Sequence, residues 1–204
     1  MNIGVLISGR GSNLQALIDA AAEPGYPAKI VTVISNKPAV QGLERAAKAG
    51  IPTAVVNHRD YPDRQAFEAE LDKQLRAASV ELVCLAGFMR VLTPWFIGQW
   101  HDRLINIHPS LLPDFPGLDT HARALAAGAE QSGCTVHYVR EDVDAGPIIL
   151  QAAVPILPDD DADTLAARVL EAEHRAYPQA VRLIAQGRVR VDGSRTIIDE
   201  TIPG

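Results

Sequence analysis

The chain has 204 residues and a formal net charge of −6, and 47% of its residues are hydrophobic. A chain of this length can bury a full core, so we expect a single domain over residues 1–204, with an N-terminal half over about 1–100 and a C-terminal half over about 101–204. The acidic balance argues against a nucleic-acid partner, because neutralising phosphates requires clustered Lys and Arg.

The apolar run over residues 3–7 is too short for a signal peptide or a membrane span, and no charged segment precedes it. Cys84 and Cys134 lie inside apolar stretches, which is typical of buried free thiols rather than of a disulfide or a metal site. We therefore expect a cytoplasmic protein with no membrane partner.

Short apolar runs alternate with longer amphipathic stretches in the first half of the chain. This alternation is typical of β-α-β units that form a parallel sheet with helices on both faces, so the predicted fold class is α/β with a mostly parallel, Rossmann-like sheet. The predicted strands are Asn2–Ile7, Lys29–Ser35, Thr53–Val56, Leu82–Ala86 and Leu104–His108, with helices over about 12–22, 39–49 and 63–77.

The pattern changes after His108, where a Pro-rich loop and a short helix near 120–127 are predicted. Two apolar runs follow, Thr135–Val139 and Ile148–Val154, and we expect them to pair as antiparallel strands. A long helix is predicted over about 163–185, and Asp192-Gly193 between alternating residues predicts a terminal hairpin.

The segment Ser8–Asn13 joins the first strand to the first helix and holds two glycines. Glycines let the backbone turn tightly and present N–H groups to an anion, and Ser12 or Asn13 is a candidate cap for the helix. A plain strand-to-helix turn is the other interpretation. A dinucleotide site is disfavoured because the third glycine of G-x-G-x-x-G is replaced by Leu14, and no Gly-Lys-Ser/Thr triplet supports a P-loop.

Asn106 and His108 lie at the end of a predicted strand, where alternation sends both side chains to the same side. An amide donor beside a titratable imidazole suits the stabilisation of an oxyanion by Asn106, with His108 as acid or electrostatic partner. Asp144 lies in a later turn whose glycine, Gly146, allows close approach of another backbone. A carboxylate beside His108 would favour the imidazolium and fix its protons.

The same residues also fit a simpler interpretation, in which His108 bonds a backbone carbonyl and Asp144 stabilises only its own turn. The remaining histidines show no metal-ligand spacing with cysteines or carboxylates, so we predict no metal site. They are His58, His101, His121, His137 and His174.

Four segments, in this order and at this spacing, resemble the motifs of the phosphoribosylglycinamide formyltransferase family. They are ISGRGSN at 7–13, LAGFMRVL at 85–92, NIHPSLLP at 106–113 and DVDAGPII at 142–149. The resemblance spans essentially the whole chain, and it implies a single formyltransferase domain that transfers a formyl group from 10-formyltetrahydrofolate to the amine of 5'-phosphoribosylglycinamide in purine (IMP) biosynthesis. It also implies that Asn106, His108 and Asp144 are catalytic.

The resemblance further implies two sets of binding residues. Those expected to hold the phosphorylated substrate are Gly11, Ser12, Asn13 and Glu173. Those expected to hold the folate are Arg64, Met89, Arg90, Val91, Leu92, Arg140, Glu141, Asp142 and Val143. The implied partners are these small molecules, and a homodimer would need an exposed apolar face that the sequence does not locate.

Three alternatives remain open. The formyltransferase that acts on initiator methionyl-tRNA resembles the chain less, since it carries an extra C-terminal domain and a basic surface. Formyltetrahydrofolate hydrolase would keep the same catalytic residues and use water as acceptor, but it usually carries an additional N-terminal domain, whereas the first strand here begins at residue 2. A non-catalytic phosphosugar or folate sensor is the alternative from another class.

Overall fold

The computed structural model describes residues 1–200. The chain forms two compact units, Met1–Asn106 and Ile107–Gly204. Strand β5 (Leu104–His108) contains the boundary between them. The expectation that both units work as one domain stays a prediction.

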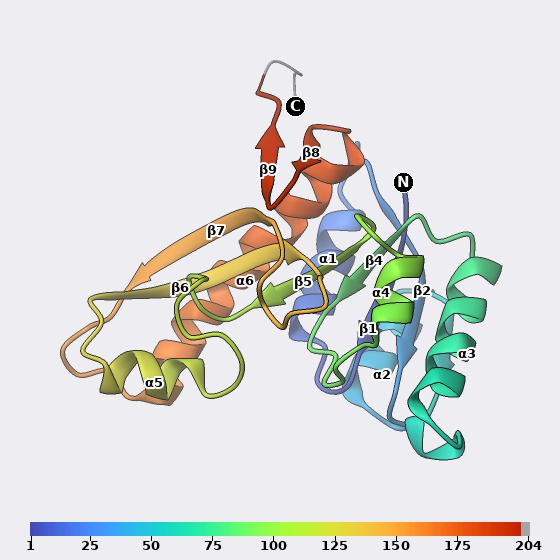
Figure 1. The fold of residues 1–204 in the computed structure, drawn as a ribbon, viewed down its shortest axis with the longest axis horizontal. Helices are drawn as coiled ribbons and strands as arrows, with labels where there is room; N and C mark the ends of the chain where they lie inside the picture. The colour runs from blue at the N-terminus through green and yellow to red at the C-terminus, as the bar shows by residue number, and fades with distance from the viewer. Residues whose placement is uncertain (201–204) are drawn as a thin grey trace. The chain divides into compact units, whose positions relative to one another are not determined.

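The first unit is built on parallel strands in the order β3-β2-β1-β4-β5, and β1, β2, β4 and β5 are labelled in Figure 1. The strands preceding β5 are β1 (Asn2–Ile7), β2 (Lys29–Ser35), β3 (Thr53–Val55) and β4 (Leu82–Leu85). The apolar side chains of β1 and β4 are buried because helices cover both faces of a parallel sheet, whereas Val55 of β3 is exposed. The α/β prediction is confirmed, although β3 and β4 each end one residue earlier than the sequence suggested.

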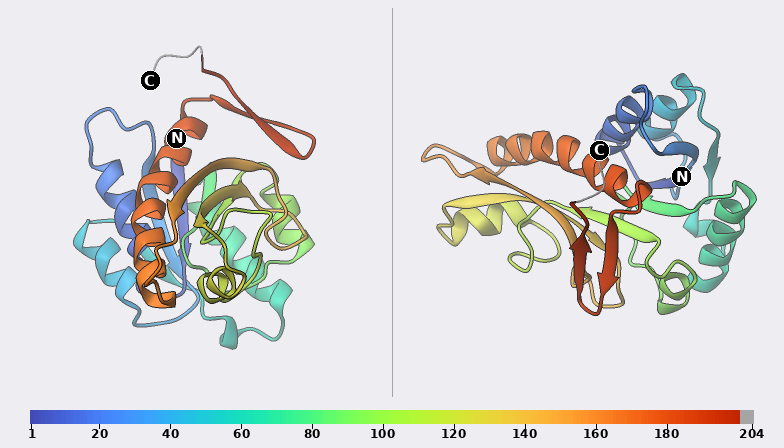
Figure 2. Two further views of the ribbon diagram at one scale, coloured as in Figure 1. Left: turned by 90° about the vertical axis from the view of Figure 1, so that its left-hand side faces the viewer. Right: turned by 90° about the horizontal axis from the view of Figure 1, so that it is seen from above.

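Helices cover both faces of this sheet (Figure 2). The helices α1 (Ser12–Ala21) and α2 (Gln41–Lys48) contact each other, as do α3 (Arg64–Ala77) and α4 (Pro94–Gln99). Asp63 caps α3 by accepting a hydrogen bond from the Ala66 N–H at 2.8 Å. The hydrophobic pattern does not reveal α4 or a 3-10 turn, η1 (His58–Asp60), because both are too short to show a helical period.

The strand order reverses beside β1. The chain moves outward from β1 to β2 and β3, and then returns to place β4 on the other side of β1. The Ser8 N–H donates to the Gly87 carbonyl at 3.1 Å, so the segments that follow β1 and β4 lie side by side. Open α/β sheets bind their ligands at such a reversal, beyond the carboxyl ends of the strands.

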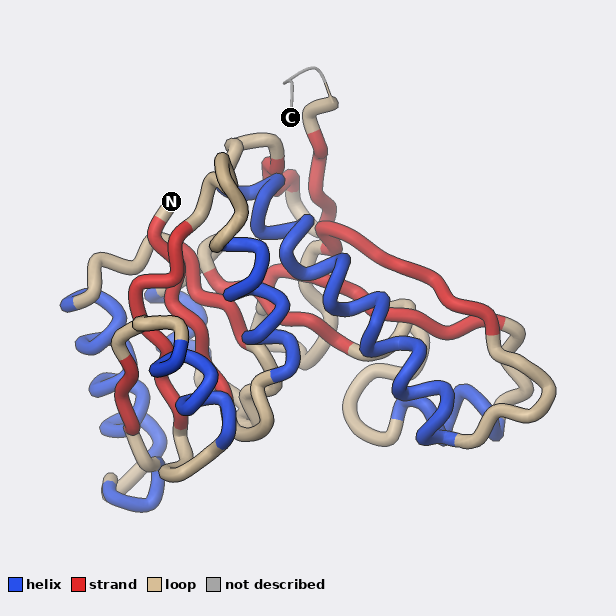
Figure 3. Tube along the Cα trace, turned by 180° about the vertical axis from the view of Figure 1, so that it is seen from behind, coloured by secondary structure: helices blue, strands red, loops and turns tan. Residues whose placement is uncertain are grey.

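The second unit contains two paired antiparallel strands, β6 (Gln131–Tyr138) and β7 (Ile148–Pro155). The long helix α6 (Ala162–Ala185) packs against both strands, as Figure 3 shows. The remaining elements are α5 (Thr120–Ala126), β8 (Val189–Asp192) and β9 (Arg195–Ile198), and the last two form the predicted hairpin. Strand β6 begins earlier than predicted, at Gln131, and Gly133 pairs with Ala153 of β7. A Cβ on Gly133 would lie 2.1 Å from the Ala152 carbonyl oxygen of β7.

Cys84 and Cys134 are both buried thiols, as expected. Burial, followed by the negative charge of Glu173, raises the pKa of the Cys134 thiol to about 12, so this sulfur stays protonated. Over residues 1–200, no helix is both long and apolar enough to cross a membrane.

Candidate functional site

The segment Gly9–Asn13, which we call the anion loop, connects β1 to α1. Gly11 is the N-cap of α1 with a left-handed backbone (φ 71°, ψ 38°), and no side chain caps the helix. The prediction that Ser12 or Asn13 caps α1 is therefore wrong, since both lie in its first turn. The first N–H groups of a helix have no intrahelical acceptor, so an uncapped first turn presents donors and a positive dipole end to an anion.

Gly11 fits its place for two reasons. Its positive φ is costly for residues with a Cβ, and a Cβ there would lie 2.7 Å from the Cα of Gly42 on α2. A Cβ built on Gly9, by contrast, would meet no described atom within 4 Å. The loop is therefore closely packed against α2 at Gly11 and open at Gly9.

The segment Met89–Leu92 follows β4 beside the anion loop. The Ser8 hydroxyl accepts a hydrogen bond from the Met89 N–H at 2.8 Å and donates to Asn36 Oδ1 at 2.5 Å. Met89 and Val91 expose 65% and 58% of their surface, whereas Leu92 is buried. Apolar side chains exposed beside a backbone that is firmly held suit a flat apolar ligand.

Glu68 of α3 holds the other end of this segment. Its side chain is fully buried and accepts hydrogen bonds from the Thr93 N–H at 2.8 Å and from the Thr93 hydroxyl. Thr93 in turn caps α4. Residues 89–92 are thus anchored on both sides, while Arg64, at the start of α3, is exposed.

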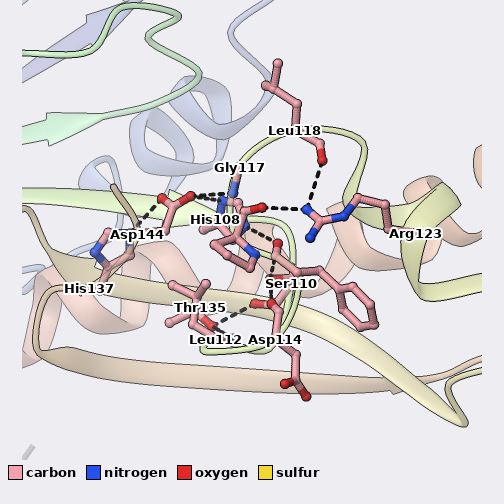
Figure 4. A network of polar contacts seen from close by, with 12 residues as sticks. His108, Ser110, Leu112, Asp114, Gly117, Leu118, Arg123, Thr135, His137 and Asp144 are labelled. Carbon is pink, nitrogen blue, oxygen red and sulfur yellow. Dashed lines mark hydrogen bonds and ion pairs between the residues drawn. The ribbon is translucent and has the colours of Figure 1, made fainter. Parts of the chain in front are cut away.

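His108, His137 and Asp144 form a buried group in the second unit, which we call the histidine cluster (Figure 4). Asp144 Oδ2 lies 3.3 Å from His108 Nδ1 and accepts a hydrogen bond from the Gly117 N–H at 2.9 Å. Asp144 Oδ1 lies 3.6 Å from His137 Nε2. The expected proximity of Asp144 and His108 is confirmed.

Both ring nitrogens of His108 face oxygen acceptors. Nδ1 faces the Asp144 carboxylate, and Nε2 lies 3.0 Å from the Phe115 carbonyl oxygen. A neutral imidazole carries only one N–H, so this arrangement is fully satisfied by the doubly protonated imidazolium. His108 thus contacts the Phe115 backbone carbonyl, as the simpler interpretation expected, and also the Asp144 carboxylate.

The backbone of Asp144 is left-handed (φ 57°), a conformation that aspartate tolerates better than most residues. The turn closes tightly behind it, because a Cβ on Gly146 would lie 1.8 Å from the Tyr138 carbonyl oxygen. This is the close backbone approach that the glycine predicted. Asp144 also borders a cavity of about 380 Å³ whose lining includes Leu112 and Ile148.

The charge of Asp144 is stabilised by its neighbours. Burial acts to raise the pKa of this carboxyl, but hydrogen bonding from His137 and the Gly117 N–H, with the positive charges of His108 and His137, lowers it below its ordinary 3.8. Asp144 therefore stays ionised at neutral pH.

No sequence motif assigns a role to His137, and the structure places it in the histidine cluster. His137 lies near the end of β6, and its Nδ1 is 2.9 Å from the Tyr138 carbonyl oxygen. From Ser132 to Tyr138 every residue is buried, so no alternation marked the side on which His137 lies. Its position at a strand end, shortly before the Asp144 turn, was the one available signal.

The remaining predicted residues divide between the two units. Asn106 is half-buried on β5 and ends the first unit. Glu173, which is expected to hold the substrate, is buried on α6. Arg140 is half-buried and residues 141–143 are exposed. In the described part of the chain, no group of three or more His, Cys, Asp or Glu side chains could hold a metal ion.

Comparison with known proteins gives concordant results. A family model described as formyl transferase matches residues 1–181. The phosphoribosylglycinamide formyltransferase of Escherichia coli strain K12 is 45% identical over 199 residues, which cover 98% of this chain and 94% of that protein. The crystal structure of glycinamide ribonucleotide transformylase 1 from Symbiobacterium toebii superposes with a TM-score of 0.95 at 48% identity, covering 97% of this chain and 93% of that one.

A much longer protein contains a segment that is similar to this chain. The trifunctional purine biosynthetic protein adenosine-3 of Drosophila pseudoobscura pseudoobscura is 60% identical over 190 residues, or 92% of this chain. The chain spans only 14% of the length of that protein.

Proposed function

The chain belongs to the formyl transferase family, and we propose that it transfers a formyl group from 10-formyltetrahydrofolate, its cosubstrate, to the amine of 5'-phosphoribosylglycinamide in purine (IMP) biosynthesis. The observation that carries the proposal is the buried His108, whose ring nitrogens face the Asp144 carboxylate and the Phe115 carbonyl. This arrangement favours a cation that can donate an N–H to an oxyanion.

Asn106 and His108 would stabilise the charge that develops when the amine attacks the formyl carbon. We propose that the formyl oxygen replaces the Phe115 carbonyl as acceptor of the His108 Nε2–H, while the Asn106 amide donates a second hydrogen bond. Asp144 holds the imidazolium through Nδ1. Preorganised donors of this kind stabilise the transition state more than the ground state.

The proton balance closes without another reactant. The attacking amine loses one proton and the departing folate nitrogen gains one, while the formyl carbonyl is re-formed. The cavity beside Asp144 has room for a water molecule, and we propose that such a water carries this proton.

The two sets of binding residues predicted from the sequence would hold the phosphorylated substrate and the folate. We propose that Gly11, Ser12 and Asn13 bind the phosphate through the uncapped end of α1, with Glu173 on the remainder of the substrate. Met89, Arg90, Val91 and Leu92 would line the folate site with Arg140, Glu141, Asp142 and Val143, and Arg64 would bind the folate carboxylate tail. The exposure of Met89 and Val91 supports this assignment.

We further propose a cytoplasmic location and small-molecule partners, without nucleic acid or membrane. The net charge of −6 supports the absence of a nucleic-acid partner. Light scattering of the purified protein tests the homodimer that the sequence left open.

The proposed reaction is tested by mixing the purified chain with 10-formyltetrahydrofolate, with and without phosphoribosylglycinamide, and following release of tetrahydrofolate. We expect release only with the acceptor. Release without acceptor would show hydrolysis, and binding without turnover would identify a sensor. His108→Gln should abolish release, whereas His101→Gln, a change at an exposed histidine, should retain it.

A further inference from the structure

We propose that Arg45 of α2 is a positioning residue for the anion loop, and through it for the phosphate of the acceptor. The Arg45 Nε–H donates to the Arg10 carbonyl in the middle of the loop at 2.9 Å. This inference rests on the proposed role of the loop in binding the substrate phosphate. It concerns a residue that no sequence motif singled out.

The peptide geometry explains how a contact behind the loop orients donors in front of it. The only cis peptide bond in the described chain is Leu112-Pro113, so the loop peptides are trans, and in a trans peptide the C=O and the following N–H point in opposite directions. Because the Arg10 carbonyl points to Arg45, the Gly11 N–H points away from the guanidinium. The contact therefore fixes the direction of a donor that the anion would use.

A second contact from α2 acts in the same way on the preceding peptide. The Gly42 N–H donates to the Gly9 carbonyl at 3.1 Å, which turns the Arg10 N–H away from α2. Carbonyl oxygens repel anions, so binding one on this loop requires that they face elsewhere. Gly42 and Arg45 together hold two successive carbonyls on the α2 side.

Arg45 is itself held in place. The Arg45 Nη1–H also donates a hydrogen bond to Gln15 Oε1 on α1 at 3.2 Å. One guanidinium from α2 therefore contacts both α1 and the anion loop. The planar guanidinium presents several donors in a fixed arrangement, which a single ammonium group does not reproduce. Its half-buried position also reduces competition from water.

The test compares Arg45→Met with Lys48→Met, which removes the same charge from an exposed position on the same helix. If a charged hydrogen bond positions the loop, Arg45→Met should raise the KM for phosphoribosylglycinamide roughly 10- to 100-fold. The kcat and the KM for 10-formyltetrahydrofolate should change less than about twofold. Lys48→Met should leave all three constants close to wild type. Calorimetric titration with phosphoribosylglycinamide checks the same loss without turnover.

Gly42→Ala provides a variant that keeps every charge. The new Cβ would lie 2.5 Å from Ile7 Cδ1 and 3.1 Å from the Gly9 carbonyl oxygen, so it should displace the loop and weaken acceptor binding in the same way. Thermal denaturation identifies any variant that is unfolded, and KM is compared among folded variants.

Two results would overturn the positioning role. One is an Arg45→Met protein that matches Lys48→Met. The other is a defect that disappears when salt rises from about 0.05 to 0.5 M, because screening would then show that charge alone attracts the phosphate. A wild-type protein that neither binds nor formylates the acceptor would instead refute the proposed function.

Discussion

The anion loop and the histidine cluster prepare their donors in different ways. The anion loop uses backbone N–H groups, and its shape depends on the left-handed Gly11 and on the helices packed around it. The histidine cluster uses side chains, and its shape depends on contacts between ionisable groups that are distant in the sequence. Backbone donors keep their character at every pH, whereas the donors of the histidine cluster depend on protonation.

This difference predicts which kinetic step a substitution in each region should affect. A substitution in the anion loop should weaken binding of the phosphorylated acceptor and leave the chemical step largely intact. A substitution in the histidine cluster should slow the chemical step. Kinetic and stability measurements on single variants therefore distinguish the two regions.

Beside the loss of release expected for His108→Gln, Asp144→Asn should have the next largest effect on turnover. The amide keeps the shape of the carboxylate but loses the charge that favours the His108 imidazolium, so kcat should fall by roughly 100- to 10,000-fold. Steady-state kinetics with both substrates measures the change, with Asp159→Asn, at an exposed position, as the matched control. A kcat within about tenfold of wild type would remove Asp144 from the mechanism.

Asn106→Ala should come next. Removing one well-placed oxyanion donor lowers turnover by about 100- to 1000-fold, and the KM for the phosphorylated acceptor should stay near wild type. Turnover close to that of the wild type would contradict the assignment of Asn106 and leave His108 as the candidate oxyanion donor.

Gly11→Ala tests the anion loop. The positive φ and the short distance to Gly42 both oppose a Cβ, so the loop should relax and the KM for the acceptor should rise roughly tenfold or more, with kcat much less affected. Titration with the acceptor measures the loss. If kcat falls while KM stays constant, the separation between the two regions is incorrect.

The smallest expected effect is a loss of folding stability at low pH, and it should arise from the histidine cluster alone. The pKa of Asp144 is lowered in the folded state, so its contribution to the free energy of unfolding is present above the ordinary value of 3.8 and is lost as pH falls through the folded pKa. Urea unfolding of wild type and Asp144→Asn should therefore show a stability difference near neutral pH that shrinks below pH 3.8. A difference that is independent of pH would contradict the charge argument, and Gly11→Ala should show none of this dependence.

Local patterns in the sequence predict the strands and most of the helices of the fold. The bounds of β1, β2 and β5 agree with the hydrophobic runs, because burial on both faces of a parallel sheet demands continuous apolar residues. The apolar run Leu104–His108 predicts the strand that ends with Asn106 and His108. The turn signal Asp192-Gly193 predicts the hairpin β8–β9. These features depend on neighbours in the chain, which a sequence records directly.

Contacts between groups that are distant in the sequence depend on tertiary packing. The approach of Asp144 to His108 depends on the left-handed backbone of Asp144 and the Tyr138–Gly146 contact, and His137 joins them from the uniformly buried β6. The contact of Arg45 with the anion loop likewise depends on how α2 packs beside α1. Such contacts are set by strand pairing, turn conformation and helix packing, and no periodicity along a single segment encodes them.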